Sequence, residues 1–88
     1  MAGFYVEITV DDVAALPFSA PGMLVLCVEM APDEAIKPGC RYWIIRDGRR
    51  LFATVPLIAG DKIEARVCGV WGDYEHLWWP DDPTNDLA

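Results

Sequence analysis

Residues 41–58 have the sequence RYWIIRDGRRLFATVPLI, which contains the strongest short-range structural signal in the chain. Two runs rich in aromatic and β-branched residues, 41–46 and 51–58, flank Asp47 and Gly48. An Asp-Gly pair strongly favours a two-residue hairpin turn, because both central residues of a type I′ turn need a positive φ angle. The stretch therefore predicts a β-hairpin.

Two registers are compatible with this turn. If Asp47 and Gly48 are its two central residues, Trp43 lies opposite Phe52, and two arginines also face each other across the strands. If Gly48 instead comes first in a type II′ turn, Asp47 faces Arg50 in a favourable opposite-charge pair. Turn statistics favour the first register by a small margin.

Alternation of apolar and polar residues indicates further strands on both sides of the hairpin. Residues 4–10 alternate strictly, and their expected buried face consists of Phe4, Val6, Ile8 and Val10. Residues 62–68 alternate in the same way, and Gly69 beyond them suggests a bulge or a close backbone approach. Residues 23–30 are apolar apart from one glutamate, which is typical of a central strand covered on both faces.

Short helical turns are expected at two places. An aspartate opens one over residues 11–16, and Pro17 ends it. Residues 73–79 are expected to form the other, with Asp73 as its N-cap and Pro80 as its end.

Short strands separated by Gly- and Pro-containing turns predict an all-β fold. We expect residues 1–80 to form a single domain, a small five- or six-stranded antiparallel barrel or sandwich with at most one or two short helical turns. Closure into a barrel would remove the strand edges that so many apolar strands otherwise expose. Residues 81–88 are polar and interrupted by proline, so they are expected to form an acidic, loosely held tail.

The 88-residue chain has a formal net charge of -7, and its charges are segregated along the sequence. All seven basic residues lie between positions 37 and 66, whereas residues 1–36 and 67–88 carry only acidic ones. An overall acidic field argues against binding to nucleic acid or to an anionic membrane. The acidic ends either fold back and neutralise the basic centre, or they face away from it and give a dipolar surface that orients a charged partner.

Residue types that carry catalysis are sparse. His76 is the only histidine and Ser19 the only serine, and the residues around Ser19 do not resemble a nucleophile elbow. The three cysteines, Cys27, Cys40 and Cys68, are an odd number with wide spacing, unlike a disulfide framework or a CxxC zinc site. The chain contains no glycine-rich phosphate loop. We therefore expect no enzymatic activity, no metal and no cofactor.

The same features predict a cytoplasmic protein without a membrane segment. The first ten residues have no positive charge and no apolar core typical of an export signal. The longest uninterrupted apolar run, residues 23–28, is far shorter than the ~20 residues that a membrane-spanning helix needs.

The segment 70–82 contains three of the four tryptophans, surrounded by carboxylates. Aromatic anchors inside a charged rim are typical of protein interfaces, and an acidic rim suits a partner with a basic surface. The expected partner-binding residues are Asp73, Tyr74, Glu75, Trp78, Trp79, Asp81 and Asp82. In the competing interpretation these rings form a lid over one end of the barrel.

The hairpin offers an alternative site for single-stranded nucleic acid. Its candidate residues are Arg41, Tyr42, Trp43, Arg46, Arg49 and Arg50, which combine rings that stack on bases with cations that pair phosphates. A cross-strand core pair with a solvated face of arginines explains the same pattern, and the net charge favours that explanation.

The function predicted from the sequence is that of a non-enzymatic protein-binding module: an inhibitor, an adaptor or an accessory subunit, with imitation of nucleic acid as one way to inhibit a basic partner. An oligonucleotide-binding barrel is the alternative. The apolar excess and the opposed charges also predict a homodimer.

The hairpin interpretation is tested by Gly48→Val. A β-branched residue is strained at a positive φ angle, so the variant should lose about 1 kcal/mol or more of unfolding free energy. Chemical denaturation measures this loss, and an unchanged midpoint would remove the turn assignment.

Overall fold

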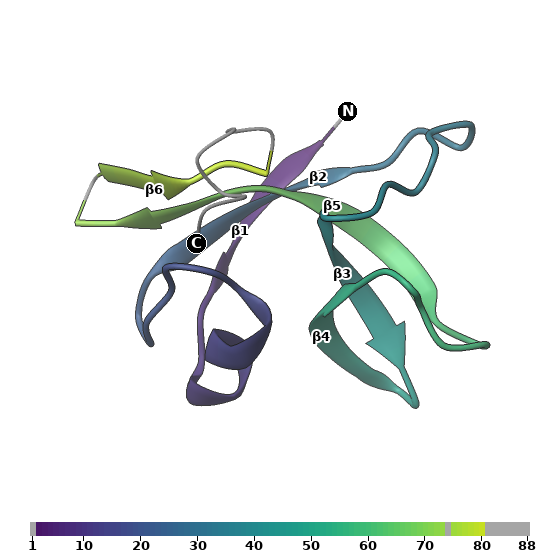
Figure 1. Ribbon diagram of the computed structural model, residues 1–88, viewed down its shortest axis with the longest axis horizontal. Helices are drawn as coiled ribbons and strands as arrows, with labels where there is room; N and C mark the ends of the chain where they lie inside the picture. Colours follow the sequence, from purple (N-terminus) through teal and green to yellow (C-terminus); the bar gives the residue numbers. More distant parts are fainter. Residues whose placement is uncertain (1, 74, 81–88) are drawn as a thin grey trace.

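The computed structural model describes residues 2–73 and 75–80, which form one antiparallel sheet and a short 3₁₀ helix (Figure 1). The elements are β1 (Gly3–Glu7), η1 (Val10–Ala15), β2 (Leu24–Glu29), β3 (Arg41–Arg46), β4 (Arg49–Thr54), β5 (Lys62–Gly72) and β6 (Glu75–Trp78). Five strands follow the order β1-β2-β5-β3-β4, and β6 pairs with β5. The predicted all-β, antiparallel fold is confirmed, while the expected tail 81–88 lies outside the described residues.

The β3–β4 hairpin has the first of the two predicted registers, with Arg46 opposite Arg49. Asp47 and Gly48 have φ angles of 52° and 76°, as a type I′ turn requires. The two facing arginines are tolerated because Arg46 turns to the carboxylate of Asp61, to which its Nε and Nη2 donate hydrogen bonds of 2.8 and 2.6 Å.

β5 organises the sheet because three strands pair with it. β2 follows one edge of β5, and β3 and β6 share the other. The register shifts at three points: Glu64 is an extra residue against β3, Cys68 is an extra residue against β2, and Leu77 of β6 is an extra residue against β5. Bulges of this kind bend a strand and increase its twist, and β5 arches over the other strands in Figure 1.

Gly69 follows the second bulge and also permits a close approach, so both expectations for this glycine are confirmed. A Cβ atom at this position would lie 3.1 Å from the carbonyl oxygen of Trp78 and 3.1 Å from Cε3 of Trp79. The missing side chain therefore lets the end of β6 lie directly against β5.

The main core lies on the inner face of the curved sheet. Its buried members are Ile8, Leu16, Val25, Cys27, Phe52, Ala65, Val67, Val70 and Trp78. Trp78 is the largest of the fully buried side chains, at 2 % exposure. A second, smaller cluster lies on the opposite face of β3 and β4 and consists of Cys40, Tyr42, Ile44 and Ala53. The Tyr42 hydroxyl accepts a 2.7 Å hydrogen bond from the backbone N–H of Lys37, which ties the preceding loop to this cluster.

The sheet does not close into a barrel, because β1 and β4 are not paired with each other. Instead, η1 packs against β4. Arg41 holds this arrangement together: its Nε donates to the carbonyl of Ala15 at 3.4 Å, and its guanidinium lies 5.4 Å from the centroid of the Trp78 ring. The helical turn thus covers a side of the core that strand pairing was expected to cover.

Two strand boundaries differ from the expectation. The first strand ends at Glu7, and Val10, which was expected to be buried, begins η1 and is 77 % exposed. Asp12 accepts a 2.9 Å hydrogen bond from the backbone N–H of Thr9, and this capping interaction favours a helical turn over a longer strand. The return strand of the hairpin ends at Thr54, shortly before Pro56, which has no N–H to donate to a ladder.

Asp73 and residues 75–79 do not form the expected helical turn. Asp73 has a φ angle of 50° and lies in the turn between β5 and β6, and His76 pairs with Trp71 across the resulting hairpin. The long neighbouring strand supplies backbone partners for these residues, and this tertiary pairing overrides the local helix signal.

We predict that Trp78 is a structural residue of the core. Trp78→Ala should reduce the unfolding free energy by about 3–5 kcal/mol, because it leaves a large cavity in the inner face. Tyr5→Ala, at a position that is 60 % exposed, should change it by about 0.5 kcal/mol or less. Thermal and chemical denaturation of both variants measure the difference, and equal losses would contradict the placement of Trp78.

Candidate functional site

The residues predicted to bind a partner differ in how far the structure exposes them. Trp78 is buried in the core, as the lid interpretation expects, so it is not available as a surface anchor. Asp73 and Glu75 are exposed at the β5–β6 turn. Trp79 is half-buried, and its ring centroid lies 4.1 Å from that of His76. Three further predicted residues, Tyr74, Asp81 and Asp82, lie outside the described residues.

The alternative nucleic-acid residues do not form an exposed stacking platform. Tyr42 is fully buried, and Trp43 packs against Phe52 in the core with ring centroids 4.6 Å apart. Base stacking needs an exposed ring face, so neither aromatic residue can provide it in this conformation.

Most of the arginines of this hairpin have partners inside the domain. Arg46 pairs with Asp61, and Arg50 pairs with Glu64 at 3.0 Å. Arg49 is exposed and makes no ion pair with the described residues. Two arginines of the basic centre are therefore paired with carboxylates from the same part of the chain, and Arg66 is paired with Glu34 of the N-terminal region.

The Arg46–Asp61 pair also affects titration. The hydrogen bonds from Arg46 lower the pKa of the Asp61 carboxyl, and a further 2.8 Å hydrogen bond from the backbone N–H of Ile58 acts in the same direction. This pair ties the loop that precedes β5 to the end of β3.

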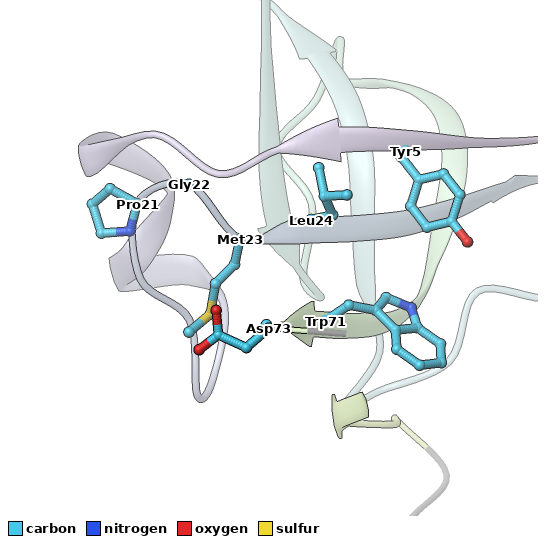
Figure 2. A pocket seen from close by; sticks show the side chains of 8 residues that line it. Tyr5, Pro21, Gly22, Met23, Leu24, Trp71 and Asp73 are labelled. Carbon is cyan, nitrogen blue, oxygen red and sulfur yellow. The ribbon is translucent and has the colours of Figure 1, made fainter. Parts of the chain in front are cut away.

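A groove on the outer face of the sheet gathers residues that the sequence did not associate with one another. It has a volume of about 780 Å³ and is lined by Tyr5, Pro21, Gly22, Met23, Leu24, Trp71, Gly72 and Asp73 (Figure 2). Tyr5 is 60 % exposed and Leu24 is 42 % exposed, so both leave apolar surface open to solvent in this groove. Of the predicted site residues, Asp73 is the one that lines this groove.

The register explains why these side chains meet. Leu24 of β2 pairs with Glu7 of β1 on one side and with Trp71 of β5 on the other. Tyr5 lies two residues before Glu7 on the same face of β1, since side chains alternate along a strand. The one signal in the sequence is Tyr5, an aromatic residue on the polar side of the first strand's alternation.

The charge around the groove has one sign. Neither lysine nor arginine occurs among the described residues that line it, and Asp73 stands at its end (Figure 2). Glu7 is exposed on the neighbouring strand. Among the ion pairs found in the described part of the chain, Glu34–Arg66 joins the acidic N-terminal region to the basic centre. Neither Asp73 nor Glu7 forms an ion pair with another described residue.

Two buried polar atoms lie behind the wall of the groove. Trp71 Nε1 and His76 Nε2 have no hydrogen-bond partner among the described residues. Their rings are in edge contact, with centroids 5.4 Å apart, and Trp71 makes a similar contact with Trp79 at 5.5 Å. These contacts hold the indole of Trp71 at the side of the groove.

No three His, Cys, Asp or Glu side chains of the described residues come together as metal ligands. Burial, assisted by the nearby Cys68, raises the pKa of Cys27 to about 12, so this thiol stays protonated and is a poor nucleophile.

Comparisons with protein-family models, with curated proteins and with solved structures find no match to this chain. A membrane-crossing helix, long and apolar enough to span a bilayer, does not occur in the described residues.

We predict that acid weakens the fold partly through Asp61. Its lowered pKa means that the ionised carboxylate stabilises the fold above about pH 4, near the pKa of a free aspartate, and that this contribution is lost as the pH falls through the pKa of the folded state. Asp61→Asn should therefore lower the melting temperature at pH 7, and the difference from the wild type should shrink at pH 2–3.

Glu64→Gln is the matched control, because Glu64 belongs to the more exposed pair with Arg50. Exposed pairs contribute little, so this variant should have a smaller effect at pH 7. A pH-independent difference for Asp61→Asn would argue against a role for its charge.

Proposed function

We propose that this protein is a non-enzymatic protein-binding module whose binding surface is the groove on the outer face of β1, β2 and β5. The observation that carries the proposal is the combination of exposed Tyr5 and Leu24 with the half-buried ring of Trp71 in one concave, negatively rimmed surface. Contiguous exposed apolar surface of this kind marks interaction sites in small proteins.

The composition of the groove fits the anatomy of an interface. Aromatic and aliphatic side chains make up most of its lining and the carboxylate of Asp73 lies at one end, which fits an anchoring core beside a polar rim. The rim and the acidic N-terminal region favour a partner with a basic surface, because complementary charge steers the encounter and disfavours acidic competitors.

An inhibitor, an adaptor or an accessory subunit would each use such a surface. An inhibitor could present its carboxylates in place of the phosphates of nucleic acid on a basic target. Oligonucleotide binding has less support, since the rings of the candidate hairpin face the interior. A homodimer stays a prediction, and sedimentation at tens of micromolar protein measures it.

A photo-crosslinking amino acid placed at position 24 tests the proposal. The labelled protein should form a specific adduct in a lysate of the native host, and Tyr5→Asp should reduce the yield at least about ten-fold by removing an aromatic anchor. Position 58 is the control. Ile58 is also an exposed aliphatic residue, at 59 % against 42 % for Leu24, but it belongs to the loop between β4 and β5.

A specific adduct at position 24 that is absent at position 58 supports the groove as the binding surface. The same adducts at both positions, or an adduct insensitive to Tyr5→Asp, would contradict it. Circular dichroism should show that Tyr5→Asp remains folded, since Tyr5 is not a core residue.

A further inference from the structure

We propose that the groove receives the cationic side chain of a lysine or an arginine of the partner protein. This inference rests on the proposed function and specifies the chemistry by which the groove recognises its partner. It follows from three properties of the lining residues: the placement of the rings, the apolar floor, and the position of the carboxylate.

The rings of Tyr5 and Trp71 flank the floor of the groove. They come from β1 and β5, the two strands that pair with β2, which carries Leu24 (Figure 2). The face of an aromatic ring attracts a cation placed over it, and the attraction increases where water is excluded. Trp71 is held in place by the edge contacts with His76 and Trp79, so this wall of the groove is formed before a ligand arrives.

The floor suits the hydrocarbon part of a long basic side chain. Lysine and arginine bury their methylene stems against apolar surface while the charged head reaches a polar environment. Leu24 and Met23 provide that apolar surface along the start of β2, and Gly72 leaves room beside Met23, whose Cε would lie 3.0 Å from a Cβ at this position.

The charged head would meet a carboxylate. Asp73 is exposed in the β5–β6 turn, and Figure 2 shows its side chain at the end of the groove where Met23 lies. Glu7 adds negative charge from the adjacent strand, and none of the described lining residues is basic. A neutral side chain would fill the same space without this attraction, and an acidic one would be repelled.

Four peptides that differ at one central residue test the inference. The residue is arginine, lysine, norleucine or glutamate, in otherwise identical neutral decapeptides, and norleucine preserves the stem of lysine without its charge. Binding to the isotope-labelled full chain is measured from the NMR shifts of the backbone amides of Leu24 and Trp71. The arginine and lysine peptides should bind at least about ten-fold more tightly than the norleucine peptide, and this advantage should shrink as salt increases.

Asp73→Asn should reduce the advantage of the cationic peptides and leave the norleucine peptide unchanged. Asp47→Asn is a closely matched control. Asp47 occupies a two-residue hairpin turn with a φ angle of 52°, against 50° for Asp73, so both substitutions remove one charge from the same backbone conformation. Asp47→Asn should leave the advantage intact.

Three results would overturn the inference. Equal binding of the norleucine and lysine peptides would mean that the groove selects apolar side chains. Equal effects of Asp73→Asn and Asp47→Asn would mean that net charge, and not the groove, attracts the cations. Absence of shifts at Leu24 and Trp71 with all four peptides would remove the site as a receptor for a single side chain. In each case the crosslinking experiment at position 24 still tests, independently of the peptides, whether the groove binds a protein.

Discussion

β5 pairs with three other strands, and the shape of the molecule depends on this pairing. Its eleven residues pair with β2 along one edge and with β3 and β6 along the other. A straight strand would hold these partners in a flat sheet with little interior. The bulges at Glu64 and Cys68 bend it, and Gly69 allows the end of β6 to approach, so that the ring of Trp78 comes to rest inside the curve.

The position of Trp78 in turn determines which surface stays open. One large ring fills much of the inner face, and η1 with Arg41 covers the side where β1 and β4 do not meet. The outer face of β3 and β4 is covered by the loops around the Tyr42 cluster. Fewer described residues cover the outer face near the end of β5, where Tyr5 and Leu24 keep much of their surface exposed.

The ion pairs also differ between the two parts of the molecule. The basic centre of the chain supplies its own counter-ions through Asp61 and Glu64, because β3, β4 and the start of β5 are neighbours in space. The acidic N-terminal region obtains one such partner, the Glu34–Arg66 pair. The groove lies on the part of the sheet where the exposed carboxylates of Glu7 and Asp73 are found.

Local chemistry was sufficient to predict the all-β class, the hairpin and the special role of Gly69, because turn residues and period-two alternation act over a few neighbouring positions. It left two hairpin registers open and favoured the observed one by a small margin. It was not sufficient for β6, where pairing with β5 overrides the helix-capping signal of Asp73. Val10 is a different case, because the hydrogen bond between Thr9 and Asp12 that favours a helical turn there is itself local. Local chemistry also could not predict the groove, because Tyr5, Leu24 and Trp71 lie far apart in sequence and meet only through strand order and register. Whether a tryptophan anchors a partner or fills the core depends on which face of the curved sheet it occupies, and long-range packing alone decides this for Trp78.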